Sequence, residues 1–178
     1  HHLGEVTYFS PLADTSLPDA GFVYLPGGYP ELYLAALSAN RQMLQSIRRY
    51  VESGGKLLAE CGGMMYLCDE IRDKNGDVYP MAGVLHQSAT MENMKLRLGY
   101  RTLLYNETRL KGHEFHYSRL VEQQNPLPSC AVAYTAKGVE TDTPLYHYKN
   151  VWAGYTHLYW ADPVGNEWFT KFVIDGNT

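Results

Sequence analysis

The chain has 178 residues, of which 45% are hydrophobic and 19% charged, with a formal net charge of -4. This length suits one domain with a sizeable core, and the net charge argues against a nucleic-acid partner or an anionic membrane surface. No apolar run approaches the roughly 20 residues of a membrane-spanning helix. The three cysteines show neither a disulfide framework nor metal-ligand spacing, so we expect no metal site and a reducing, cytoplasmic location.

The first half of the chain alternates strand and helix patterns. His1 and His2 are interpreted as a tag remnant, so the predicted domain spans residues 3–178. Helical periodicity runs from Glu31 to Val51 with a break near Asn40, where "SAN" is a plausible helix stop and N-cap. The other predicted elements are strands at Glu5–Phe9, within Gly21–Gly28 and at Lys56–Glu60, and a helix at Met64–Ile71. Short apolar strands alternating with helices indicate a parallel sheet covered on both faces.

The second half changes character. From Val78 to His157 the sequence contains many short β-like runs, and Pro163–Ile174 is again predicted to be a helix, with proline at its first position. One α/β domain with β-rich additions is therefore expected.

Cys61 lies at the junction of the strand Lys56–Glu60 and the following helix. A nucleophile on such a turn is exposed to substrate and close to unpaired backbone N–H groups, which favour a thiolate. Gly62 and Gly63 permit a tight backbone and a close approach by substrate. The alternative is that Cys61 is a small buried hydrophobic residue and that the glycines serve only the turn. This context alone does not decide between the two.

Two further features favour a catalytic site. Gly27 and Gly28 end another strand, and in a parallel sheet the carboxyl ends of strands meet at one edge, where free N–H groups stabilise an oxyanion. His157 follows a late β-like run and is a candidate base, because a cysteine hydrolase needs a histidine that the fold brings close.

Four motifs, "LPGGYPE", "AECGGMMYL", "KGHEFHYS" and "GYTHLYW", occur in this order. With their spacing, the chain resembles the class I (triad-type) glutamine amidotransferase domain of the cobyrinic acid a,c-diamide synthase family. The resemblance runs from about Glu5 to the C-terminal helix. It implies a flavodoxin-like, mostly parallel sheet flanked by helices.

The resemblance also implies roles for the matching residues. Cys61 would attack the carboxamide of glutamine, and His157 would act as the base. Gly28 and Gly62, with Gly27 beside them, would bind the oxyanion or substrate. Ammonia would pass to an ATP-dependent synthetase domain of the same protein, which would use ATP and Mg²⁺ to amidate a corrin precursor. The amidotransferase domain itself would need no cofactor.

This sequence departs from the family pattern in several places. Tyr159 stands where many relatives have a glutamate two residues after the histidine. Either another acid, such as Glu60 or Glu114, orients His157, or the site works as a Cys-His dyad. Met65 stands near the place of a glutamine that helps relatives to bind substrate. On the strand of "KGHEFHYS", alternation places Glu114 and His116 on one face, near the glutamine site or as a structural polar pair.

The family's first strand and helix, and the synthetase domain before them, are absent from these 178 residues. We therefore expect either a piece of a longer protein with an exposed sheet edge, or a neighbouring copy that fills the gap and makes a homodimer. Alternative functions are the amidotransferase domain of cobyric acid synthase or of a peptidoglycan-precursor amidating enzyme. An alternative of another class is a non-catalytic binding module.

Overall fold

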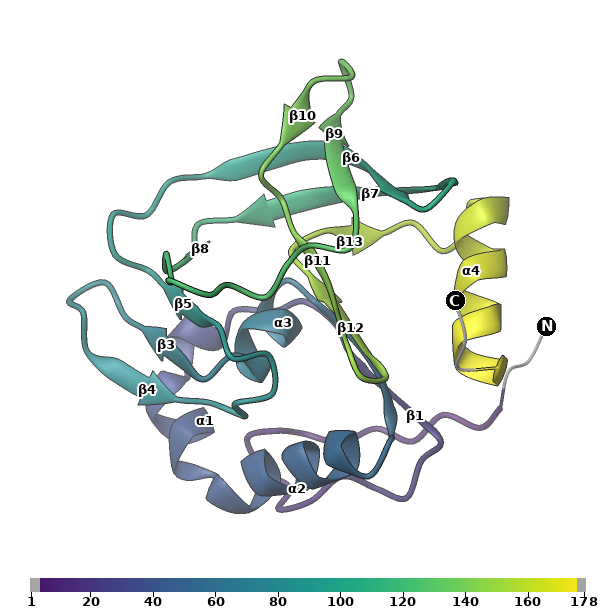
Figure 1. Cartoon of the computed structure of the whole chain (residues 1–178). Helices are drawn as coiled ribbons and strands as arrows, with labels where there is room; N and C mark the ends of the chain where they lie inside the picture. Colours follow the sequence, from purple (N-terminus) through teal and green to yellow (C-terminus); the bar gives the residue numbers. More distant parts are fainter. Residues whose placement is uncertain (1–3, 176–178) are drawn as a thin grey trace.

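A computed structural model describes residues 4–175 of the chain (Figure 1). Its central sheet has the order β1-β2-β12-β11. Strands β1 (Phe22–Leu25), β2 (Lys56–Glu60) and β12 (Val151–Gly154) run parallel, and β11 (Leu145–Tyr148) is antiparallel to β12. The predicted mostly parallel sheet is thus present, and the predicted strand Lys56–Glu60 has the observed bounds.

The helices follow the strands as the sequence indicated. The helical region after β1 is divided into a 3₁₀ turn η1 (Pro30–Leu32), α1 (Leu34–Ala39) and α2 (Arg41–Glu52). The side chain of Asn40 accepts a hydrogen bond from the Met43 N–H, so Asn40 caps α2 and the predicted break is confirmed. Helix α3 (Gly62–Leu67) follows β2, and α4 (Pro163–Asp175) begins at the proline predicted to start it.

Two further sheets account for the β-rich second half. The larger is antiparallel and has the order β10-β9-β6-β7-β13. Its long hairpin is β6 (Arg97–Tyr105) and β7 (Thr108–His116), with β9 (Val132–Thr135), β10 (Glu140–Thr141) and β13 (His157–Leu158). The smaller has the order β4-β3-β5-β8 and consists of β3 (Glu70–Arg72), β4 (Val78–Pro80), β5 (Ser88–Thr90) and β8 (Arg119–Leu120).

The central sheet separates two hydrophobic cores. Side chains alternate between the two faces of the sheet along β2. Leu57 and Ala59 therefore lie in a core shared with α1, α2 and α3, whereas Leu58 lies in a second core. The second core contains Trp152 from β12 and Phe172 from α4, both fully buried. Figure 1 shows α4 on the side of the sheet away from α3. Both faces are therefore covered, and the carboxyl ends of the parallel strands β1, β2 and β12 lie at the same edge of the sheet.

Two predicted elements are wrong. Residues Glu5–Phe9 do not form a strand; Val6 and Tyr8 are 75% and 91% exposed, because no neighbouring strand pairs with them. An open groove of about 1240 Å³ instead separates residues 4–12 from β1, which pairs only with β2 among the described residues. The helix predicted at Met64–Ile71 runs from Gly62 to Leu67, since the β-branched Ile71 pairs in β3 with Ala89 and Tyr79.

Candidate active site

Cys61 occupies a strained turn between β2 and α3. Its φ of 49° and ψ of -110° lie outside the regions that ordinary residues adopt, and such strain is characteristic of nucleophiles on strand-to-helix turns. The Cys61 N–H donates to the Gly154 carbonyl at 2.8 Å, which fixes the turn to β12. The thiol lies 3.9 Å from the Phe115 carbonyl oxygen of β7 and is largely buried. The sulfur is thus held at the carboxyl edge of the sheet.

The two glycine turns meet beside this thiol. A Cβ atom on Gly62 would lie 2.6 Å from the Gly28 carbonyl oxygen, and one on Gly63 would overlap the Leu25 carbonyl. Only glycine allows these backbones to approach so closely. Among residues 4–175, the amide N–H groups of Gly28 and Gly62 donate to no other group. Both are therefore available to a ligand at Cys61.

His157 lies on β13, the short edge strand that pairs with β7. Its imidazole stacks on that of His113, the residue directly opposite in the register, with ring centroids 5.1 Å apart. On its other side is Gly27, where a Cβ atom would lie 3.0 Å from Nε2 and even closer to Cε1. The ring therefore lies between the first glycine turn and β7, and the Cys61 thiol is the main cause of its raised pKa.

Glu60 is the acid that faces His157. The Oε2 atom of Glu60 lies 3.6 Å from Nδ1 of His157, which leaves Nε2 as the ring nitrogen available to the thiol. Two donors hold this buried carboxylate in place: the Tyr24 hydroxyl donates to Oε2 at 2.7 Å, and the Leu158 N–H donates to Oε1 at 3.1 Å. Tyr159 is 59% exposed. Its backbone N–H donates to the Lys111 carbonyl.

The environment of His157 favours its protonated form. Interaction with Cys61, and next with Glu60, raises the pKa of His157 to about 9, although partial burial opposes this. A protonated imidazole next to a thiol stabilises the thiolate by charge, as in other cysteine nucleophiles. The pair therefore has the arrangement of an activated nucleophile and its acid-base partner.

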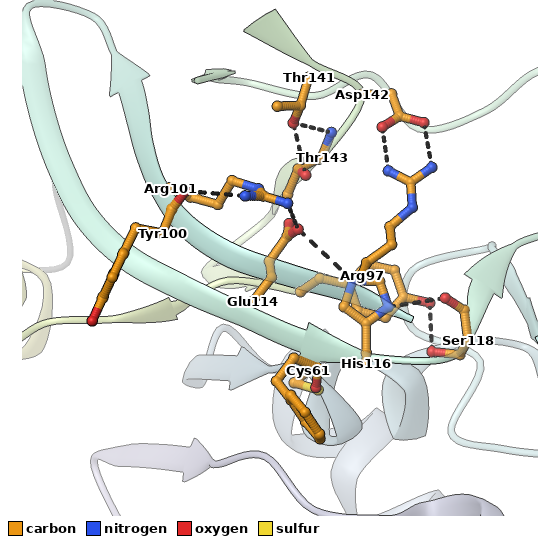
Figure 2. A network of polar contacts seen from close by, with 12 residues as sticks. Cys61, Arg97, Tyr100, Arg101, Glu114, His116, Ser118, Thr141, Asp142 and Thr143 are labelled. Carbon is orange, nitrogen blue, oxygen red and sulfur yellow. Dashed lines mark hydrogen bonds and ion pairs between the residues drawn. The ribbon is translucent and has the colours of Figure 1, made fainter. Parts of the chain in front are cut away.

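Glu114 and His116 occupy one face of β7, as alternation predicted, and belong to a separate network (Figure 2). Oε2 of the fully buried Glu114 is 2.7 Å from an Arg101 nitrogen and 4.0 Å from Nε2 of His116. His116 Nδ1 lies 2.9 Å from the Ser118 carbonyl, and the ring stacks on Tyr155 at 3.8 Å. Burial lowers the pKa of His116, so the neutral form is favoured. Glu114 is thus paired with Arg101 rather than with His157.

A small pocket opens next to Cys61, with a volume of about 20 Å³. Its walls come from the first glycine turn with η1, from Cys61 and Met65, and from Phe115–Ser118 on β7 and beyond. The structure thus places the sequence-predicted Gly28, Cys61 and His116 around one cavity. The sequence analysis missed Tyr24, His113 and Glu31, because their positions depend on strand register and on the path of the η1 turn.

Between residues 4 and 175, no group of three or more histidine, cysteine or acidic side chains is arranged to hold a metal ion. Within that part of the chain, no helix has both the length and the apolar character required to cross a membrane.

Comparisons with known proteins agree with this geometry. Residues 1–164 match the model of the CobB/CobQ-like glutamine amidotransferase domain. Hydrogenobyrinate a,c-diamide synthase of Pseudomonas aeruginosa is 39% identical over 160 residues, which is 87% of this chain and 35% of that protein. Cobyrinate a,c-diamide synthase of Picrophilus torridus is 40% identical over 167 residues, which is 87% of this chain and 34% of that protein. The chain thus spans about a third of the length of these curated relatives.

Solved structures have the same fold at lower identity. A glutamine amidotransferase crystal structure superposes with a TM-score of 0.56 at 16% identity, covering 86% of this chain and 78% of that chain. PurLQS from Thermotoga maritima superposes with a TM-score of 0.56 at 17% identity, covering 93% of this chain and 81% of that one. These two matches support the flavodoxin-like fold. From the family model and the identities above, the chain belongs to the family of CobB/CobQ-like glutamine amidotransferase domains.

Proposed function

We propose that the chain is the glutaminase domain of a cobyrinate a,c-diamide synthase and supplies ammonia for amidation of the a- and c-carboxylates of a corrin precursor. The observation that carries the glutaminase part is the position of His157, whose Nδ1 lies 3.6 Å from Oε2 of Glu60 and whose pKa is raised by Cys61 at a strained strand-to-helix turn. The corrin acceptor is supported by the names of the relatives that are 39–40% identical.

In the first chemical step, the Cys61 thiolate attacks the carboxamide carbon of glutamine. The C=O π electrons move to oxygen, and the amides of Gly28 and Gly62 donate to the resulting oxyanion. His157 transfers its proton to the amide nitrogen, the C–N bond breaks, and ammonia leaves. The product is a γ-glutamyl thioester on Cys61 and a neutral His157.

In the second step, His157 removes a proton from a water molecule that attacks the thioester carbon. The carbon–sulfur bond breaks, glutamate leaves, and the Cys61 thiolate and protonated His157 are restored. Glu60 acts by orienting the imidazole. This keeps Nδ1 protonated and Nε2 directed at the reacting atoms. Tyr24 and the Leu158 amide in turn hold Glu60.

The ammonia is consumed by a synthetase domain that the relatives' greater length can accommodate. We propose that this domain uses ATP and Mg²⁺ to activate the corrin carboxylates, while the amidotransferase domain itself uses no cofactor. The carboxylates and the released ammonia then combine to form amides.

The proposal is tested with the full-length protein, glutamine labelled with ¹⁵N at the amide, ATP, Mg²⁺ and cobyrinic acid. Mass spectrometry should show two labelled amides on the corrin. The same reaction is repeated with cobyrinic acid a,c-diamide or a peptidoglycan precursor as the acceptor. Labelling of the diamide at further positions would identify a cobyric acid synthase, and labelling of the peptidoglycan precursor would identify the corresponding amidating enzyme. No glutamate release with any acceptor would contradict catalysis and leave a binding module.

A further inference from the structure

The pocket beside Cys61 carries one carboxylate, that of Glu31. Glu31 lies in the 3₁₀ turn η1, which directly follows the first glycine turn. The other side chains of the pocket wall are aromatic, thioether, hydroxyl or thiol groups, and the imidazole of His116, whose neutral form is favoured by burial. None of the described residues that line the cavity is a lysine or arginine. Its wall is therefore suited to a ligand with a positively charged end.

Within the described part of the chain, the Glu31 carboxylate has no partner on another residue. Apart from the Glu31 backbone amide, no group within residues 4–175 donates to it or pairs with it. Partial burial raises the pKa of Glu31, because the charged form is less well hydrated there, although the Glu31 backbone amide opposes this. Glu114, by contrast, is fully buried and is paired with Arg101. A neutral side chain would fill the Glu31 position at lower electrostatic cost.

We propose that Glu31 binds the α-ammonium group of glutamine and thereby selects the amino-acid form of the substrate. The inference rests on the proposed glutaminase function and assigns a specificity-determining residue to the same site. Cys61 attacks the carboxamide end of glutamine, and the α-ammonium is at the other end of the same small molecule. Because Glu31 lines the same pocket as Cys61, its carboxylate can bind the ammonium while the carboxamide is at the thiol. An ammonium–carboxylate hydrogen bond in a partly desolvated site is among the stronger polar contacts in proteins.

The rim of the pocket must widen to admit this substrate. A volume of about 20 Å³ holds little more than one water molecule. Tyr29 and Tyr117 line the cavity and are 58% and 41% exposed, so solvent adjoins both rings. Outward rotation of these rings would admit the substrate to the pocket that Glu31 and Cys61 share.

The test compares two substrates in the full-length protein. One is L-glutamine, and the other is glutaric acid monoamide, which lacks only the α-amino group. For Glu31→Gln we expect kcat/KM for glutamine to fall about 10- to 100-fold, because a charged hydrogen bond is lost, and kcat/KM for the monoamide to change less than about threefold. Glu107→Gln, the same change in the exposed β6–β7 turn, should leave both values unaltered.

A second measurement separates binding from folding. Alkylation of Cys61 by iodoacetamide, which carries no ammonium group, should proceed at the same rate in Glu31→Gln and in the unchanged protein. An unchanged preference for glutamine over the monoamide in Glu31→Gln, or an equal loss with both substrates, would overturn the role of Glu31. If the unchanged protein hydrolyses neither substrate, the proposed glutaminase function itself is contradicted.

Discussion

Glu60 and His157 face each other across the carboxyl edge of the central sheet, with Oε2 and Nδ1 3.6 Å apart. Glu60 is also the residue immediately before Cys61, so the carboxyl end of β2 positions both the proposed nucleophile and the acid that faces the proposed base. Tyr159, two residues after the histidine, is exposed and makes no such contact. In this chain, the acid therefore reaches the imidazole from the nucleophile's strand rather than from the histidine's own strand.

The first prediction concerns Glu60→Gln. The pKa of His157 is raised to about 9 by Cys61 and then by Glu60, so removing the Glu60 charge should lower this pKa partway toward its usual value near 6.5. In the proposed mechanism His157 is protonated before the first step, so activity should fall on the alkaline side as that proton is lost. The alkaline limb of the kcat/KM profile should therefore shift to lower pH, with a loss of about 10- to 100-fold at pH 8. An unmoved limb would contradict the assignment.

The same substitution has a signature in stability. A histidine whose pKa is raised on folding stabilises the fold fully below its unfolded pKa, near 6.5, and this stabilisation is lost as the pH rises to about 9. The difference in unfolding free energy between the unchanged protein and Glu60→Gln should therefore decrease between pH 6.5 and 9 in urea titrations. A difference that is constant over this range would show that Glu60 does not influence the titration of His157.

The second prediction is that Tyr24→Phe weakens the positioning of Glu60 without removing its charge. The variant lacks the hydroxyl that donates to Oε2 at 2.7 Å, while the Leu158 amide remains. We expect kcat to fall about 2- to 10-fold, with KM for glutamine and the alkaline limb unchanged. Tyr8→Phe is the matched control, because Tyr8 is 91% exposed and lies outside the pocket beside Cys61. Equal kinetics for both variants would exclude a positioning role for Tyr24.

The third prediction compares Gly27→Ala with Gly28→Ala. A methyl group on Gly27 would collide with the imidazole of His157, whereas a methyl group on Gly28 would meet nothing within 4 Å. Neither glycine has a positive φ, so alanine is tolerated by the backbone at both positions. Glutaminase activity should fall more than about tenfold in Gly27→Ala, since overpacking of this kind displaces side chains, and should be largely retained in Gly28→Ala. The reverse order of activities would contradict the placement of His157.

The fourth prediction concerns the ion pair of Arg101 and Glu114, whose side chains are 10% and 0% exposed. Arg101→Met leaves the Glu114 charge buried without its partner and should lower the unfolding free energy by about 3–5 kcal/mol in urea titrations. Adding Glu114→Leu should restore most of this loss, because an apolar pair replaces an isolated charge. A single variant within about 1 kcal/mol of the unchanged protein would show that the pair contributes little to stability.

Local patterns in the sequence predicted much of this fold. The apolar run at Lys56–Glu60, the Asn40 cap and the proline at the start of α4 each reflect interactions between residues close in the chain. The strand expected at Glu5–Phe9 failed because strand formation depends on a paired neighbour, and β1 has an open groove on that side. Its β-forming residues alone do not specify a partner.

The sequence likewise predicted only the part of the candidate site that local motifs carry. Cys61, His157 and the glycine turns carry recognisable motifs, whereas the choice between Glu60 and Glu114 depended on strand register. Tyr24 pairs with Leu58 in the β1–β2 register, which places its side chain on the same face as Glu60. His113 pairs directly with His157 across β7 and β13. Neither register can be predicted from a local sequence pattern, so neither side-chain contact could be predicted from the sequence alone.

The central claim is that Cys61 is the nucleophile of a glutaminase, and it is tested most directly by glutamate release from glutamine by the full-length protein. Cys61→Ala should abolish release, because no other described thiol lies in the pocket beside His157. Cys130→Ala, which removes a half-buried cysteine outside that pocket, should leave the rate unchanged. Persistent glutamate release by Cys61→Ala at the rate of the unchanged protein would contradict the account.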